Sequence, residues 1–279
     1  MNSIRIRFPG GKAKAFTMSY DDGVQQDVRL IEIMRKNGVS GTFNLNSGCF
    51  AKEGTVYPAG QVHRRMSLSE CKRAYAGEDI EVAVHTYTHP FLEQLPLSQC
   101  TMEVMLDREI LEKEFGCIVR GMAYPYGTYS DDVVMCLKAC DIVYSRTTKA
   151  THGFDMPSDW LRLGATCHHN DPQLMELADK FLEDDVRYGK AKLFYLWGHS
   201  YEFEGNDNWN VIEDFLAKVG NREDVWYATN IQVYSYNEAF KQLIFSADAR
   251  TVYNPTSTDL WFFEDGVTYK IAAGETLKK

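Results

Sequence analysis

Two short segments of the chain carry residues that could bind a metal ion. In HTYTH, residues 85–89, His85 and His89 stand four positions apart, so one helical turn would point both imidazoles the same way. In SYDDG, residues 19–23, Asp21 and Asp22 are neighbours. Two histidines and one carboxylate are the three protein ligands of a catalytic zinc-type centre. The other aspartate could then act as a general base, because neighbouring side chains leave the backbone in different directions.

Each segment also has an ordinary structural interpretation. DDG alone is compatible with a capped turn, and HxxxH alone fits two hydrogen-bonded histidines, since Pro90 disfavours a long helix at His89. Their location in the sequence favours a functional role. A strand-like run precedes each of the two segments, and one also precedes the YPYG segment at 124–127 and His199. The carboxyl ends of parallel strands converge on one face of an α/β fold. The four groups are therefore expected at one site, with His199 as a general acid.

The elements that would position these groups alternate between strand and helix. Strand-forming runs predict strands at 14–20, 41–45, 81–85, 117–124, 141–145, 192–199 and 225–229. Apolar periodicity and capping residues predict helices at 24–38, 67–77, 98–116, 130–140, 171–189, 210–220 and 236–245. This alternation over residues 1–245 favours a closed or nearly closed α/β barrel, with a doubly wound open sheet as the alternative. Period-2 segments and an EDG turn predict a small C-terminal β-hairpin extension over 246–279.

Composition limits the partners and the location of the protein. The 279 residues carry a net charge of −9, which disfavours a broad surface for nucleic acid or an anionic membrane. Neither a transmembrane run of about 18 apolar residues nor the apolar core of a signal peptide is seen. The seven cysteines are scattered without a CxxC pair, which favours reduced thiols and a cytoplasmic location. The oligomeric state is left open.

Together these motifs resemble those of the NodB-homology polysaccharide deacetylases, carbohydrate esterase family four. SYDDG matches the first family motif, HTYTH the second and YPYG the end of the third, while SDWL and LFYLWGH match the fourth and fifth loosely. The resemblance covers about residues 14–240 and implies a distorted (β/α)7 barrel. It also implies a hydrolase that removes acetyl groups from N-acetylated or O-acetylated sugars, oligosaccharides or polysaccharides. The implied cofactor is a divalent metal: zinc, with cobalt, nickel or manganese as alternatives.

The resemblance also assigns roles to individual residues. It makes Asp21 the general base, and the amide of Tyr126 a donor to the oxyanion. It makes His199 the general acid, with Asp159 as its orienting partner. The implied metal ligands are Asp22, His85 and His89. The candidates for contacts with a sugar, whose aromatic rings could equally serve packing, are Tyr124, Pro125, Trp160 and Trp197.

Position 123 departs from the family pattern. Many members place an Arg two residues before the proline of the third motif, where it pairs with the base. Ala123 stands there instead, and Arg120 lies in a different register, so another cation, or none, must tune Asp21.

The remaining histidines lie outside these motifs. His168 and His169 precede a predicted helix, where bonds to the backbone are favoured over binding of one metal ion by both. His63 and His152 are expected to be structural or surface residues.

Three other functions remain compatible with these residues. Two histidines and one carboxylate also bind iron in non-haem oxygenases, although those enzymes are not usually built on alternating βα units. The absent Arg at position 123 leaves open the hydrolysis of another C–N bond, such as that of a cyclic ureide. A non-catalytic carbohydrate-binding protein would need neither base nor acid, and the chain offers candidates for both.

Overall fold

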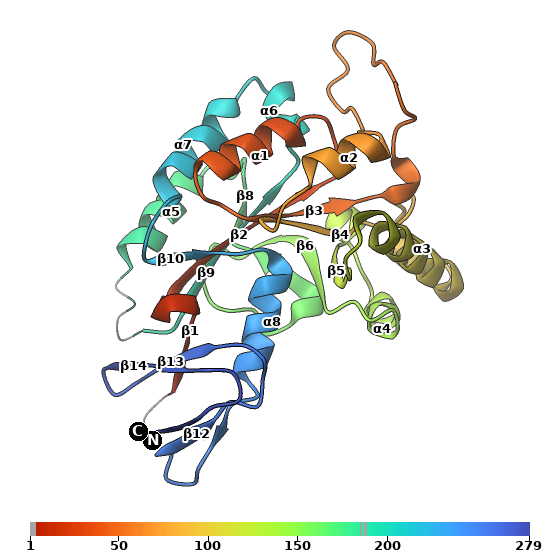
Figure 1. The fold of residues 1–279 in the computed structure, drawn as a ribbon. Coiled ribbons are helices and arrows are strands. Elements are labelled where there is room, and N and C mark those ends of the chain that lie inside the picture. Colours follow the sequence, from red (N-terminus) through yellow and green to blue (C-terminus); the bar gives the residue numbers. More distant parts are fainter. Residues whose placement is uncertain (1–3, 185, 187–188) are drawn as a thin grey trace.

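The structure, a computed structural model, describes residues 4–184, 186 and 189–279 and consists of a curled parallel sheet, covering helices and small terminal sheets (Figure 1). The central strands are β2 (Lys14–Asp21), β3 (Gly41–Leu45), β4 (Ile80–Val84), β5 (Gly121–Ala123), β6 (Tyr144–Ala150), β7 (Leu163–Ala165), β8 (Cys167–His168), β9 (Lys192–Gly198) and β10 (Val225–Tyr227). The α-helices are α1 (Asp27–Lys36), α2 (Leu68–Ala74), α3 (Leu97–Phe115), α4 (Asp131–Ala139), α5 (Leu174–Glu183), α6 (Tyr201–Gly205), α7 (Trp209–Val219) and α8 (Asn230–Phe240).

The two ends of the parallel sheet are formed by one segment of chain. The strand order is β7-β6-β5-β4-β3-β2-β9-β8, and only Thr166 separates β7 from β8. The N–H of Thr166 donates to Tyr195 O on β9, while its carbonyl accepts from His152 N just beyond β6. Because one segment pairs with both ends of the row, the strand order closes on itself. The predicted distorted barrel is confirmed, and the open doubly wound sheet does not form.

The strand that completes the ring is not the one that the sequence pattern predicts. β10 pairs with β2 at Lys14–Phe16, whereas β3 pairs with β2 at Ser19–Asp21, so β10 lies beside the ring at its amino-terminal edge. The ring is completed by the β7–β8 segment, LGATCH, which the pattern leaves unassigned. Small and polar residues in this segment hide it, because strand prediction relies on apolar alternation.

Several helix boundaries also differ from expectation. α8 begins at Asn230, because Thr229 and Gln232 form a capping box ahead of the predicted start at 236. The predicted helix at 171–189 ends at Glu183 as α5, and residues 185, 187 and 188 of that prediction lie outside the described residues. No helix in the described ranges combines the length and apolar character needed to cross a membrane.

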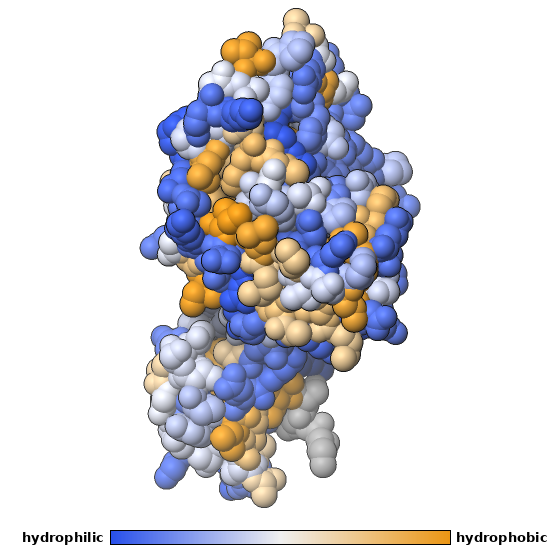
Figure 2. All heavy atoms as spheres, turned by 90° about the vertical axis from the view of Figure 1, so that its right-hand side faces the viewer, coloured by the Kyte–Doolittle hydropathy of each residue, from blue (hydrophilic) through white to orange (hydrophobic). Residues whose placement is uncertain are grey.

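α3 has apolar residues on its outer side as well as on its buried side. Met102 and Leu106 share an exposed face, and Figure 2 shows apolar side chains gathered on this side of the molecule, over the region of α3 and α4. The buried residues of α3 are Cys100, Val104, Asp107 and Leu111. Asp107 is the acidic side chain among these four, and it bonds to the loop that follows β4.

The chain ends with the predicted β-hairpin, which the N-terminus joins. β13 (Leu260–Glu264) pairs antiparallel with β14 (Val267–Ile271) and with β1 (Arg5–Arg7), which the sequence pattern does not predict. The remaining short strands are β11 (Ile244–Phe245), β12 (Thr251–Tyr253) and β15 (Thr276–Lys278). Figure 1 shows β1, β12, β13 and β14 at this end of the molecule. Phe262 is fully buried and stacks on Tyr269, and the Tyr236 hydroxyl of α8 donates to Arg7 O.

Candidate active site

The backbone is unusual where β2, β4 and β5 end. Asp22, Thr86, His89 and Tyr126 adopt φ angles of 86°, 67°, 62° and 59°, in the left-handed region. Non-glycine residues seldom adopt these angles, which cost about 1–3 kcal/mol each. Three loops that are distant in sequence keep this conformation at one edge of the sheet, as expected for a functional site whose side-chain directions are fixed by their surroundings.

Asp22, His85 and His89 converge at this edge. Each offers one ligand atom, and the three atoms all lie within 4.8 Å of one another. His85 Nδ1 lies 2.7 Å from Ala123 O, so Nδ1 donates its proton there and Nε2 keeps a free lone pair. Burial lowers the pKa of His85 to about 4, which keeps the imidazole neutral as a ligand must be. The donor set therefore fits a divalent metal ion.

Buried polar groups hold the backbone of His85 in place. Asp107 Oδ2 accepts from His85 N at 3.1 Å, and its Oδ1 accepts from Ser47 N at 2.7 Å. Asn46 Nδ2 donates to Thr86 O at 3.0 Å and also to His85 O. These contacts link α3 and the loop after β3 to the proposed ligand, and they leave its ring orientation little freedom.

Two basic side chains from the loop before α2 contact Asp22. Arg65 Nη2 donates to Asp22 Oδ1 at 2.9 Å, and His63 Nε2 lies 3.2 Å from Oδ2. Burial alone would raise the pKa of Asp22, but the bonds with His63 and Arg65 hold it well below its usual range. Asp22 is thus a carboxylate, as a ligand must be. His63, expected to be a structural or surface residue, contacts a candidate ligand, whereas His152 bonds to Asp171 outside the site.

Asp21 lies beside the ligand set and is paired with a cation from β6. Arg146 Nη2 bonds to Asp21 Oδ2, and Asn44 Nδ2 donates to Oδ1 at 2.8 Å. Burial alone would raise the pKa of Asp21, but the guanidinium of Arg146 holds it below its usual range. Ala123 and Arg146 are register partners on β5 and β6. The cation that is absent at position 123 is therefore supplied by the residue opposite it on the next strand.

His199 follows β9 and faces Asp21. Its Nε2 lies 3.7 Å from Asp21 Oδ2, while its Nδ1 lies 2.7 Å from Glu202 Oε1. Burial alone would lower the pKa of His199, but the bond with Glu202 and the charge of Asp21 raise it. His199 can therefore hold a proton next to the ligand set.

Residues 9–145 match the family model described as polysaccharide deacetylase. Over this segment the chain is similar to the polysaccharide deacetylase family. It contains Asp21, the three candidate ligands and Tyr126, and it ends one residue before Arg146. His199 lies outside the matched segment, so its role rests on geometry. No curated protein sequence matches the chain.

Two solved structures with TM-scores above 0.5 share the fold of this chain, and a third aligns over about half of it. A candidate polysaccharide deacetylase from Mycobacterium smegmatis aligns over 86% of this chain and 96% of its own, with 17% identity and a TM-score of 0.59. The Xyl-CE4 domain of a multidomain xylanase from the hindgut metagenome of Trinervitermes trinervoides aligns over 81% and 92%, with 14% identity and a TM-score of 0.52. The Streptococcus pyogenes deacetylase PplD in complex with acetate aligns over 47% of this chain and 55% of its own, with 22% identity and a TM-score of 0.41. The chain thus spans about half the length of PplD.

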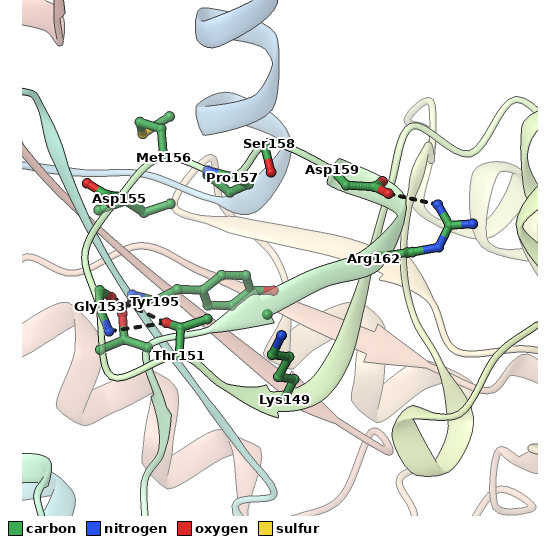
Figure 3. A pocket seen from close by; sticks show the side chains of 13 residues that line it. Lys149, Thr151, Gly153, Asp155, Met156, Pro157, Ser158, Asp159, Arg162 and Tyr195 are labelled. Atoms are coloured by element: carbon green, nitrogen blue, oxygen red, sulfur yellow. Dashed lines mark hydrogen bonds and ion pairs between the residues drawn. The ribbon is translucent and has the colours of Figure 1, made fainter.

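Asp159 does not orient His199, contrary to the prediction from the fourth deacetylase motif. It caps the short helix Trp160–Arg162 by accepting from Leu161 N at 3.1 Å, and its other oxygen binds Arg162 Nη1 at 2.7 Å. Figure 3 shows Asp159 and Arg162 joined at a separate pocket that Thr151 also lines. Asp159 comes before β7, and its partner Arg162 also bonds to Asp131 at the start of α4, so the printed contacts of Asp159 lie away from His199.

All four candidates for sugar contacts are buried. The hydroxyl of Tyr124 donates to Leu161 O at 2.8 Å, and Pro125 is buried beside it. Trp160 packs in the core with its ring edge-on to Tyr234 at 5.3 Å. The side chains of Tyr124, Pro125 and Trp160 therefore pack within the barrel, and their contact with a sugar stays a prediction.

Tyr126 and Trp197 lie at the site. The amide of Tyr126 donates to no acceptor within the described residues, so it is free to meet an oxyanion. The ring of Tyr126 stacks on Phe91 at 3.8 Å and is 51% exposed. Trp197 is buried under Arg146, with the guanidinium carbon 4.3 Å from the ring centre, so it supports the cation that pairs with the candidate base.

Four residues of the site are not predicted from the sequence. Arg146 follows a predicted strand at 141–145 that stops one residue too early, and β6 in fact continues to Ala150. Glu202 is detectable in principle, since it stands three positions after His199. His63 and Arg65 carry no local signal, because they come from a loop whose path depends on the completed fold.

Proposed function

We propose that this protein is a metal-dependent hydrolase that removes acetyl groups from N-acetylated or O-acetylated sugars. The placement of Asp21 carries the proposal: its Oδ2 lies 3.9 Å from His85 Nε2 and 3.7 Å from His199 Nε2. A base, an acid and a metal-binding set within one small volume are what hydrolysis of an amide or ester requires. The family match of residues 9–145 supports an acetylated carbohydrate as the substrate.

Asp21 is the base in this proposal. Its carboxylate accepts a proton from the water whose oxygen bonds to the acetyl carbonyl carbon. Arg146 keeps the pKa of Asp21 low, so the carboxylate is ready at neutral pH, and Asn44 fixes its orientation. Because Arg146 gives the base its cation, the departure at Ala123 no longer favours a cyclic ureide as the substrate.

Tyr126 and His199 act on the carbonyl oxygen and on the leaving group. The N–H of Tyr126 donates to the developing oxyanion. His199 Nε2 gives its proton to the sugar nitrogen, or to the sugar oxygen in an ester, as that bond to the carbonyl carbon breaks. The products are acetate and the free amine or hydroxyl. This proton matters because without it the nitrogen would have to leave as an amide anion, which is a very poor leaving group.

Asp22, His85 and His89 would hold the metal. A divalent ion, expected to be zinc, with cobalt, nickel or manganese as alternatives, supplies Lewis-acid polarisation of the acetyl carbonyl when bound. The chain's own contribution is to keep Asp22 ionised through Arg65 and to keep His85 neutral with Nε2 available.

The test measures acetate release and metal content on the same samples. The substrates are chitooligosaccharides, peptidoglycan fragments and acetylxylan. His85→Ala should lose both the metal and the activity, whereas His152→Ala, a histidine outside the site, should keep both. His199→Ala should keep the metal but lose about 10²–10⁴-fold in kcat. A His85→Ala protein that binds one metal ion with unchanged affinity would refute the ligand assignment. A metal-loaded enzyme that releases no acetate from any substrate would refute the reaction.

A further inference from the structure

Glu202 of α6 lies at the centre of a cluster of nitrogen donors. Its Oε1 lies 2.7 Å from His199 Nδ1, and its Oε2 accepts from Asn170 Nδ2 at 2.7 Å. The same Oε2 lies 3.2 Å from His169 Nε2, in a charge contact and not an aligned hydrogen bond, and 3.5 Å from His168 Nε2. Four nitrogens from two loops therefore face one carboxylate.

Contacts on the far side of the two adjacent histidines indicate which nitrogen is protonated. His168 Nδ1 accepts from Asn170 N at 3.1 Å, so its Nε2 carries the proton. His169 Nδ1 lies 3.2 Å from the hydroxyl of Tyr20. Burial raises the pKa of Tyr20 well above its usual range, so the phenol stays protonated and can donate to Nδ1. Both rings then present Nε2–H toward Glu202.

This arrangement disfavours a second metal site in the cluster, although His168, His169 and Glu202 bring their ligand atoms within 4.8 Å of one another. A metal ion needs lone pairs at both Nε2 atoms, whereas the bond from Asn170 N to Nδ1 leaves the proton of His168 on Nε2. The cluster is suited to holding an ionised carboxylate. Burial alone would raise the pKa of Glu202, but the donors from His169 and His199 hold it well below its usual range.

The loop that joins His199 to Glu202 is itself anchored. Ser200, between them, donates its hydroxyl to Asp27 Oδ1 at 2.5 Å, and both side chains are fully buried. Asp27 Oδ2 also accepts from the hydroxyl of Tyr75 at 2.6 Å. The main chain on which His199 and Glu202 stand is therefore fixed to α1, so the 2.7 Å contact between them is part of a rigid unit.

We propose that Glu202 is the positioning residue of His199, in the role that the fourth deacetylase motif predicts for Asp159. This inference rests on the proposed function. Glu202 accepts from Nδ1–H, which turns Nε2 toward Asp21 and the leaving group. Its negative charge stabilises the protonated ring until Nε2 gives its proton to the leaving atom, while Nδ1 keeps its own. His168, His169 and Asn170 hold Glu202 in place, which gives the HHN segment at 168–170 a role.

The test compares Glu202→Gln with Glu204→Gln, a change on the same helix at a residue bonded to Arg64. In Glu202→Gln, kcat should fall about 10²-fold with KM changed less than about threefold and metal content unchanged. The basic limb of the kcat profile should move to lower pH, because the charge that favours the protonated ring is lost. The titratable groups that face His199 are Asp21, Asp22, His168, His169, Glu202 and Tyr201. Glu204→Gln should match wild type in all four measurements.

Two further measurements keep the proposal testable. Glu202→Asp keeps the charge, so its basic limb should stay near that of wild type even where kcat falls. In ¹⁵N-histidine NMR spectra, His199 should carry its proton on Nδ1 in wild type and populate the other tautomer in Glu202→Gln. An unchanged tautomer, an unchanged pH limb, or a larger loss in Asp159→Asn than in Glu202→Gln overturns the inference. A wild-type protein without acetate release refutes the proposed function instead, and the NMR result still decides the role of Glu202.

Discussion

Replacing Arg146 by Met should leave the buried carboxylate of Asp21 without its cationic partner. The side chains of Arg146 and Asp21 are 1% and 3% exposed. In Arg146→Met, Asp21 keeps Asn44 as its hydrogen-bond donor but loses the bonded cation. The surroundings have a low dielectric constant, which strengthens the attraction between the two charges. The same surroundings make an unpaired buried carboxylate costly in free energy.

The expected loss in the free energy of unfolding is about 3–5 kcal/mol, the usual cost of removing one partner of a buried ion pair. For a chain of this size, about 2–4 °C of melting temperature accompanies each kcal/mol, so the melting temperature should fall by roughly 6–20 °C. Adding Asp21→Asn removes the unpaired charge, so the double variant should regain about 2 kcal/mol relative to Arg146→Met.

The assay is urea and thermal unfolding in the presence of a chelator, since a bound metal would add its own stabilisation. Arg162→Met is the matched control, because Arg162 is 33% exposed and its pair with Asp159 is solvated. It should change the free energy of unfolding by less than about 1 kcal/mol. An Arg146→Met protein within about 1 kcal/mol of wild type, or a double variant with no recovery, would refute the assignment of Arg146 as the partner of Asp21.

Three further outcomes follow from single contacts. Burial raises the pKa of Asp27 to about 7, so the stability linked to its proton is present below about pH 4 and is lost as the pH rises toward 7. In urea titrations, the free energy of unfolding of Asp27→Asn should not fall with pH in this way, so it should increase relative to that of wild type between about pH 5 and 8. Parallel pH dependences of the two proteins would contradict the raised pKa. A Cβ at Gly198 would lie 1.9 Å from His169 Nδ1, so Gly198→Ala should lower the free energy of unfolding by about 1–3 kcal/mol. Gly153→Ala, with 3.8 Å to its nearest neighbour, is the control, and equal unfolding curves would refute the clash. Tyr126→Gly keeps the amide at φ 59°, so kcat should stay within about threefold of wild type, and a loss above about 100-fold would assign the role to the ring.

The candidate ligand set can be predicted from the sequence because its geometry is local. His85 and His89 stand four residues apart just after β4, and Asp22 directly follows β2. Once each strand is recognised, its end position places these groups on the same rim, whatever the details of packing. The family match over residues 9–145 covers the same segments.

The seventh barrel strand and the partner of His199 were not accessible in this way. The β7–β8 segment has no apolar alternation, and its strand geometry comes from pairing with β6 and β9. Asp159, which the fourth motif predicts as the partner of His199, instead caps the short helix before β7 and bonds to Arg162. Glu202 meets His199 because α6 turns immediately after β9.

The chain's primary structure specifies the alternation of strands and helices, the rim on which the polar groups lie, and the candidate metal ligands. The folded barrel alone decides which charges meet them. Arg146 reaches Asp21 through the register that sets it opposite Ala123, and Glu202 reaches His199 through the turn into α6. Ligand spacing depends on neighbours a few bonds away. The partners of a buried charge depend instead on strand order, register and ring closure, which no short segment encodes by itself.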